Sequence, residues 1–86
     1  MAAKPIRFSA HALGYMERRG FCQEDVEKSI RTCPWDKAGR DRRECRMELP
    51  FCEHWNGHEY AFRQIRPIFV EESSEIVVIT VYVYYY

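Results

Sequence analysis

A histidine, a tyrosine and two arginines recur along one short segment, Ser9–Phe21, at spacings that suit chemistry on a phosphate. In a helix, one face is shared by positions i, i+4, i+7 and i+8, which here are His11, Tyr15, Arg18 and Arg19. Cleavage of an RNA backbone needs a base for the 2′-hydroxyl proton, an acid for the leaving 5′ oxygen and a cation beside the phosphate. These residue types are therefore sufficient in kind for metal-independent RNA cleavage, in which His11 would transfer a proton and Arg19 would stabilise the phosphate.

The same side chains have structural roles open to them. His11 can cap or pack at the start of the helix. The two arginines can pair with Glu17, with carboxylates of the following helix, or with the negative C-terminal end of their own helix. Residue types alone leave both interpretations open.

The cysteines and the other histidines do not predict a metal site. The expected hairpin register places His54 and His58 on opposite faces, and separates Cys45 from Cys52 in the same way, so four ligands do not converge as zinc requires. Cys22 stands near a helix N-terminus, which favours a thiolate, but a small buried residue is the simpler interpretation. The four cysteines lack CxxC spacing, so we expect reduced thiols and no cofactor.

Composition bounds the size and the partners of the protein. With 86 residues we expect one small domain, 1–86, whose modest core favours dimerisation or partner binding. Residues 1–46 hold eleven Lys/Arg and seven Asp/Glu, so this half carries a mild basic field that permits a phosphate-bearing partner. We expect no signal peptide and no membrane span, because the longest apolar run, Ile76–Val83, is far too short; the predicted location is cytoplasmic.

Two helices are expected in the first half of the chain. Ser9 can cap a helix over Ala10–Arg19, and Gly20 can end it in the left-handed conformation. Acidic residues at the start of Gln23–Thr32 favour a second helix. The short link between the two predicts a helical hairpin, followed by a charged loop over residues 35–43.

The second half alternates like β-structure. Turns at Asn56–Gly57 and Ser73–Ser74 predict a three-stranded antiparallel meander, with Ile6–Phe8 as a fourth, edge strand. This register gathers one apolar face, made of Met47, Leu49, Phe51, Tyr60, Phe62, Ile68, Val70, Val77, Ile79, Val81 and Val83. The predicted fold is therefore α+β, with the helical hairpin packed on one face of a three- or four-stranded antiparallel sheet.

The opposite face is expected to carry Glu48, Cys52, His54, Arg63, Ile65, Thr80, Tyr82, Tyr84 and Tyr86. Three tyrosines and an arginine can stack on bases or bury in a dimer interface. Arg63 and Tyr82 are thus further catalytic candidates, and the substrate-binding candidates are Tyr15, Arg18, Arg43 and Tyr84. If the helices cover the apolar face, His11 reaches Arg63 only around a sheet edge, so a single shared site stays open.

The order Ser9-x-His11-Ala12-x-x-x-Met16-x-x-Arg19-Gly20-Phe21, with a terminal strand Val77–Tyr82, resembles a bacterial family of domains of unknown function. That family is similar to the RelE/BrnT-like toxins of toxin–antitoxin pairs, which are small α+β ribonucleases. In the family an arginine usually stands where this chain has Tyr15.

The resemblance implies an endoribonuclease that cleaves mRNA or ribosome-associated RNA and is silenced by a bound antitoxin protein. From the size of the chain and its tyrosine face we also expect a homodimer. The alternative function is a non-catalytic interaction module, joined to a second copy or to a partner through the tyrosine face.

Overall fold

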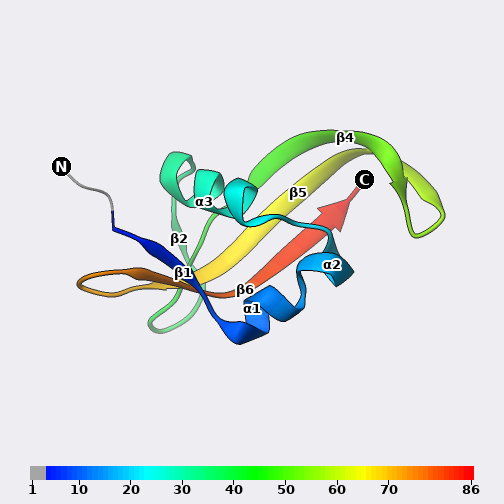
Figure 1. The fold of residues 1–86 in the computed structure, drawn as a ribbon. Coiled ribbons are helices and arrows are strands. Elements are labelled where there is room, and N and C mark those ends of the chain that lie inside the picture. Colours follow the sequence, from blue (N-terminus) through cyan, green and yellow to red (C-terminus); the bar gives the residue numbers. More distant parts are fainter. Residues whose placement is uncertain (1–3) are drawn as a thin grey trace.

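Two long antiparallel strands, β5 (His58–Glu71) and β6 (Ile76–Tyr85), form the centre of the sheet in the computed structural model, which describes residues 4–86 (Figure 1). The strand β1 (Ile6–Phe8) pairs with β6 in parallel, and β4 (Met47–Trp55) pairs with β5 antiparallel. Two short strands, β2 (Asp36–Lys37) and β3 (Arg43–Glu44), extend the sheet beyond β5. Within the described residues the sheet is mixed and has six strands.

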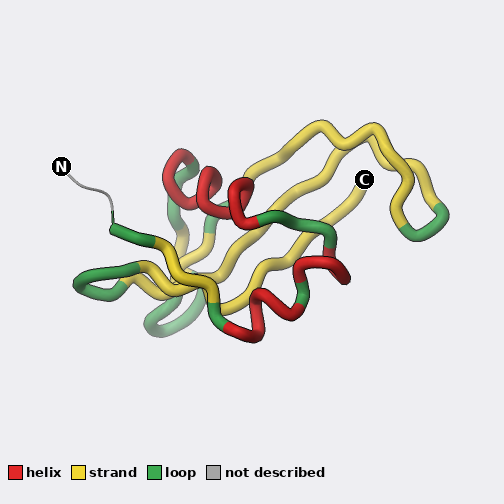
Figure 2. Tube along the Cα trace, in the orientation of Figure 1, coloured by secondary structure: helices red, strands yellow, loops and turns green. Residues whose placement is uncertain are grey.

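Three short helices lie on one side of this sheet, which we call the helix face, and the other side is the outer face (Figures 1 and 2). They are α1 (Ala10–Gly14), α2 (Met16–Arg19) and α3 (Gln23–Thr32). α3 packs against β5, and α1 packs against β6, with α2 following it along that strand (Figure 1). The α+β class is confirmed, but a helical hairpin on a purely antiparallel sheet is not.

The sheet is larger than expected because residues predicted to be a loop pair with each other. Lys37 faces Arg43 and Asp36 faces Glu44, and the Ala38 N–H donates to the Arg42 carbonyl across the turn. The chain direction of β1 makes the sheet mixed. After β1, the Ser9 N–H donates to the Val78 carbonyl, and the chain turns directly into α1.

The residues predicted to start and end the first helical segment, Ser9 and Gly20, have these roles in the structure. Ser9 accepts a hydrogen bond from the Ala12 N–H (3.1 Å), and Gly20 ends α2 with φ 73°. The helix expected over Ala10–Arg19 is nevertheless interrupted at Tyr15 (φ −102°, ψ 0°), directly after Gly14, a poor helix former. The second helix spans Gln23–Thr32 as predicted.

Both predicted turns are confirmed, but bulges shift the register beyond each of them. Trp55 faces His58 across Asn56–Gly57, and Val70 faces Val77 across the second turn. A bulge between Pro50 and Glu53 then moves Leu49 opposite Arg63 instead of Gln64. In β6, Ile79 is the extra residue of a second bulge, so Ile68 pairs with Thr80.

The second bulge exchanges the faces of several residues in β5, because side chains alternate along a strand. Arg63 and Ile65, expected on the outer face, lie on the helix face, where Arg63 faces Tyr85 and Ile65 faces Val83. The residues that move the other way, from the expected apolar face to the outer face, are Phe62, Ile68, Val70 and Val77. The tyrosine face predicted for β6 stays outside.

The core lies between the helices and the centre of the sheet. Its buried members are Ala12, Phe21, Val26, Ile30, Cys45, Ile65, Phe69, Ile76, Val78 and Val81. Ile65, Phe69 and Val81 are fully buried, whereas Tyr82 and Tyr84 are 41% and 44% exposed. The alternation along β6 thus separates an apolar side covered by helices from a tyrosine side left open.

Gly20 meets a close approach that only glycine permits. A Cβ there would collide with the Tyr85 hydroxyl and would lie 2.9 Å from the Trp55 ring, in addition to the strained positive φ. We expect Gly20→Ala to lower the free energy of unfolding by about 2 kcal/mol, measured by urea denaturation.

The matched control for this substitution is Gly14→Ala. A Cβ at Gly14 meets nothing within 4 Å, so the variant should match or exceed the wild type by up to about 1 kcal/mol. Equal stability of the two variants would contradict the close packing of Gly20.

Candidate functional site

The side chains predicted to share a helix face meet at the edge of β6. The rings of His11 and Tyr15 lie 4.8 Å apart, and the Arg19 guanidinium lies 4.0 Å from the centre of the Tyr15 ring. The same guanidinium also lies 5.1 Å from the centre of the Tyr82 ring. We call His11, Tyr15, Arg18, Arg19 and Tyr82 the edge cluster. It joins α1 and α2 to the outer face of β6.

Arg19 is held in this position by the sheet edge. Its Nη1 donates to the Thr80 hydroxyl (3.1 Å) and to the Val81 carbonyl (2.9 Å). Among the described residues, Nε and Nη2 of Arg19 have no acceptor. A guanidinium that is fixed on one nitrogen and flanked by two rings keeps its other N–H groups for a ligand.

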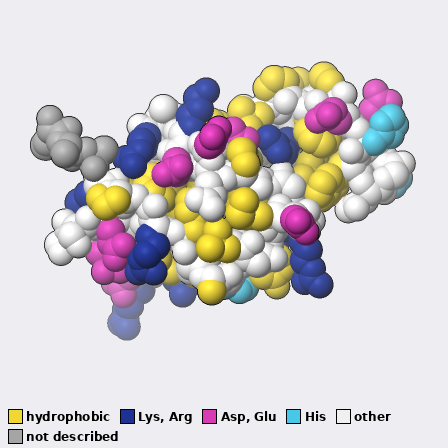
Figure 3. Space-filling view, viewed as in Figure 1, with side chains coloured by type: hydrophobic (Ala, Val, Ile, Leu, Met, Phe, Trp, Pro, Cys, Tyr) yellow, Lys and Arg dark blue, Asp and Glu magenta, His cyan; other side chains and the backbone are white. Residues whose placement is uncertain are grey.

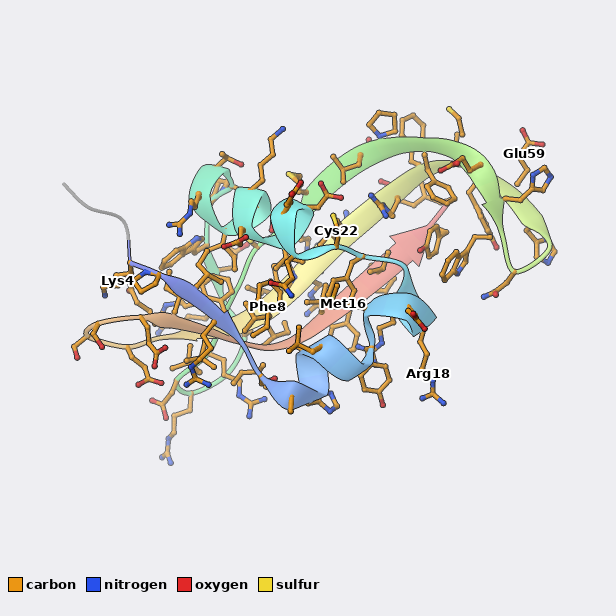
Figure 4. The ribbon with its side chains drawn as sticks, in the orientation of Figure 1. Lys4, Phe8, Met16, Arg18, Cys22 and Glu59 are labelled. Atoms are coloured by element: carbon orange, nitrogen blue, oxygen red, sulfur yellow. The ribbon has the colours of Figure 1, made fainter. Side chains whose placement is uncertain are left out.

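His11 and Arg18 occupy the solvent side of the edge cluster. His11 is exposed and makes no side-chain hydrogen bond within residues 4–86. Arg18 lies 5.8 Å from the Tyr15 ring and projects away from the body of the protein (Figure 4). The His11 imidazole is therefore open to a ligand from solvent, and Arg18 adds an exposed positive charge to the same cluster.

The outer face continues the alternation of rings and cations. Arg66 lies 5.8 Å from the Tyr82 ring and donates to the Tyr84 hydroxyl (3.2 Å). Glu44 holds Arg66 in place, because its Oε2 accepts a hydrogen bond from Nε of Arg66 (2.7 Å) and lies 2.6 Å from Nη2 in an ion pair. The hydrogen bonds from Arg66 to Glu44 and Tyr84 raise the pKa of the guanidinium, so it stays charged.

Sequence reasoning missed Arg66 and chose Arg63 in its place. The two residues are three positions apart in β5, so they always lie on opposite faces of the strand. The predicted register put Arg63 outside, and the one-residue bulge at Ile79 reversed the choice. The signal available in the sequence was Pro67, which marks a site of irregular pairing.

Arg63 has a structural role on the helix face. It donates to the Gly20 carbonyl (2.7 Å) and to Asp25 (3.1 Å), and its side chain is 19% exposed. Its guanidinium also lies 5.7 Å from the Phe51 ring. These contacts join α3 and the end of α2 to the sheet, so Arg63 does not share a site with His11.

Tyr85 is a second anchor that the sequence did not single out. Its ring stacks on Trp55 (5.0 Å, 17°), and its hydroxyl donates to the Arg19 carbonyl (2.7 Å). Burial raises the pKa of this phenol. Tyr85 thus fixes the backbone of the residue whose side chain enters the edge cluster.

The remaining predicted binding residues lie apart from His11. Arg43 is in β3 and donates to the carbonyl of Arg42 (3.5 Å), within its own hairpin. Tyr84 is exposed on the outer face beside Arg66. Tyr86, the last of the three exposed tyrosines, contacts Glu48 through its hydroxyl.

Metal-ligating and nucleophilic groups do not converge in the part of the chain that the structure describes. No group of three His, Cys, Asp or Glu side chains is placed to hold a metal ion within residues 4–86. Cys45 is buried, and burial raises the pKa of its thiol to about 11, so it stays protonated at neutral pH. Cys22 is exposed at the start of α3 and provides no side-chain cap.

The helix face does not offer a comparable charged surface. Acidic and basic side chains are interspersed over it (Figure 3). Over residues 4–86, no helix is long and apolar enough to cross a bilayer.

No protein-family model, curated protein or solved structure matches this chain. The edge cluster and the outer face are therefore interpreted from their own chemistry.

Removal of Arg63 should act on stability. We expect Arg63→Ala to lower the free energy of unfolding by about 2 kcal/mol, because Asp25 and the Gly20 carbonyl lose a largely buried partner. Arg18→Ala is the control, since Arg18 is exposed and should change stability by less than about 0.5 kcal/mol. Urea denaturation compares the two; equal losses would contradict the assigned role.

Proposed function

We propose that this protein is a metal-independent endoribonuclease of the RelE/BrnT-like toxin type, with the edge cluster as its active site. One observation carries the proposal: a fixed arginine, Arg19, contacts two tyrosine rings, and a solvent-exposed histidine contacts one of these rings. The arrangement supplies a proton carrier, a phosphate-binding cation and a stacking surface within one patch.

In the proposed reaction, the 2′ oxygen of the RNA attacks phosphorus, and the bond from phosphorus to the 5′ oxygen breaks. His11 takes the proton of the 2′-hydroxyl, and the leaving 5′ oxygen takes a proton from solvent. Nε and Nη2 of Arg19 donate to the phosphate oxygens as negative charge develops. Tyr15 orients His11 and Arg19, Tyr82 stacks on a base, and the products carry a 2′,3′-cyclic phosphate and a 5′-hydroxyl.

The partners proposed for this activity follow from the charge and from the resemblance. RNA is drawn to the edge cluster by Arg18 and Arg19, in the half of the chain with the basic excess. A cognate antitoxin protein would silence the enzyme, and the basic turn of residues 40–43 is a candidate contact for it. Such a pair acts on RNA in the cytoplasm.

His11→Ala should abolish most of the activity on a single-stranded RNA. Loss of the proton carrier is expected to slow cleavage about 100-fold or more. Arg19→Lys should slow cleavage by a similar factor, because lysine keeps the charge but loses the paired N–H donors. Product ends are identified by mass spectrometry, and EDTA should leave the wild-type rate unchanged.

His54→Ala is the matched control, because His54 is an exposed histidine in β4, near the turn of the β4–β5 hairpin. It should cleave RNA at the wild-type rate. The melting temperature of each variant establishes that it folds. Wild-type protein that leaves RNA intact, or His11→Ala with unchanged activity, would refute the proposed reaction.

A second candidate function, a non-catalytic dimer or partner-binding module, is favoured by the exposed aromatic area. The large apolar side chains exposed on the outer face are Phe62, Tyr82, Tyr84 and Tyr86, each at least 41% exposed. Such a surface is typical of a protein interface, in which aromatic residues are enriched. This function requires the outer face and leaves His11 unused.

Tyr84→Ala tests the second candidate by size-exclusion chromatography at low salt. If the outer face forms a homodimer, this variant should elute as a monomer at concentrations at which the wild type is dimeric. Tyr15→Ala, which changes a tyrosine away from the outer strand face, should leave the dimer intact. A wild type that is monomeric throughout would exclude the homodimer.

A further inference from the structure

A polar hollow on the outer face lies next to the edge cluster and is not used by the proposed reaction. It has a volume of about 250 Å³ and is lined by Arg46, Gln64, Arg66 and Tyr84. Ligand pockets for drug-sized molecules start at roughly 300 Å³, so this one suits a smaller unit, such as a single nucleobase with its phosphate. Its lining combines two cations, an amide and an aromatic ring.

The two arginines of the hollow are organised by one nearly buried carboxylate. The side chain of Glu44 is 9% exposed; Oε2 accepts from Arg66, and Oε1 lies 3.6 Å from Nη2 of Arg46. A buried carboxylate needs such partners, so it fixes the guanidinium of Arg66 at the floor of the hollow. Arg46 is 57% exposed and only loosely paired, which leaves its other N–H groups open to an anion.

Gln64 and Tyr84 form the other wall. They face each other across β5 and β6, so their side chains stand side by side on the outer face. The Gln64 carboxamide makes no hydrogen bond to other side chains within residues 4–86, and the Tyr84 ring is 44% exposed. An amide with free donors and acceptors can hydrogen-bond to the edge of an unstacked base, and the neighbouring ring can stack on its face.

The carboxylate beyond this wall, Glu48, sets the direction of a bound chain. It faces Gln64 from β4 and contacts the Tyr86 hydroxyl, so its negative charge lies at the base end of the hollow. A phosphate is therefore expected at the opposite end, beside Arg46 and Arg66. That end lies toward the edge cluster, because Arg66 and Arg19 both contact the Tyr82 ring.

We propose that this hollow binds one nucleotide of a single-stranded RNA, with the base against Tyr84 and Gln64 and the phosphate at Arg46 and Arg66. The inference rests on the proposed ribonuclease function, and it names the substrate class as unpaired RNA that spans two neighbouring subsites. Tyr82, which contacts both Arg66 and Arg19, connects the hollow to the position of the scissile phosphate. Duplex RNA is excluded, because its bases cannot leave the stack to reach Tyr84.

Binding of an uncleavable probe tests the hollow separately from cleavage. The probe is a fluorescein-labelled 2′-O-methyl RNA hexanucleotide, and its affinity is measured by fluorescence anisotropy over a salt series. Arg46→Ala should weaken binding on the order of tenfold and lower the salt slope by about one. Arg31→Ala, which changes an exposed arginine of α3 away from the outer face, is the control and should bind like the wild type.

The wall of the hollow is tested with a second set of variants. Tyr84→Ala should weaken binding by roughly fivefold or more, whereas Tyr84→Phe keeps the ring and should bind like the wild type. Gln64→Ala should change the ranking of the homopolymer hexanucleotides, because it removes the only amide in the lining. The same hexanucleotide in a duplex should bind at least tenfold more weakly than the single strand.

The outcomes separate this inference from the proposed function. His11→Ala should keep full affinity for the probe; if the wild type fails to cleave RNA but binding still depends on Arg46, the nuclease is refuted and the nucleotide site stands. Equal affinity of Arg46→Ala and Arg31→Ala overturns the nucleotide site. It is also overturned if Arg46→Ala and Tyr84→Ala alter only the elution volume, because the hollow then belongs to a protein interface.

Discussion

The bulge at Ile79 decides which side chains of β5 lie on each face of the sheet. One extra residue in β6 shifts its pairing with β5, so Arg63 faces Tyr85 and Arg66 faces Tyr82. Because side chains alternate along a strand, this one residue decides which arginine is buried under the helices and which lies open on the outer face. Without the bulge, the buried ion pair with Asp25 and the arginine of the outer face would exchange places.

The edge cluster exists because two anchors fix the end of α2 against β6. The Tyr85 hydroxyl donates to the carbonyl of Arg19, and Gly20, which has no Cβ, lets the chain turn away at positive φ without colliding with Tyr85 or Trp55. The Arg19 side chain is then drawn to Thr80 and Val81 at the strand edge. Backbone and side chain of one residue are thus held by separate contacts, and the guanidinium is placed beside the rings of Tyr15 and Tyr82.

Three arginines, Arg19, Arg63 and Arg66, differ in how many of their N–H groups are bound to the protein. Arg63 is bound to Asp25 and the Gly20 carbonyl on the helix face, and Arg66 is bound to Glu44 and Tyr84 on the outer face. Arg19 is fixed through one nitrogen only. A guanidinium has five N–H donors, so Arg19 keeps most of its donors for a phosphate, whereas Arg66 offers a ligand on the outer face mainly its fixed positive charge.

The sequence by itself determined the local elements. The Ser9 cap, the Gly20 stop, the bounds of α3 and the two β-turns each depend on residues within a few positions of one another, so their chemistry is visible in the linear chain. The same holds for the alternation that leaves Tyr82, Tyr84 and Tyr86 on one side of β6, and for the spacing that brings His11, Tyr15 and Arg19 together.

Only the tertiary structure decided the register, the size of the sheet and the partners of each arginine. A bulge shifts the pairing of two strands by one residue and has only a weak signal in the local sequence. Beyond the bulge, however, every side chain of the partner strand lies on the other face. The parallel pairing of β1 and the β2–β3 extension likewise depend on strands that are distant in the chain. These contacts are non-local, and so the choice of Arg66 over Arg63 for the outer face was settled by folding.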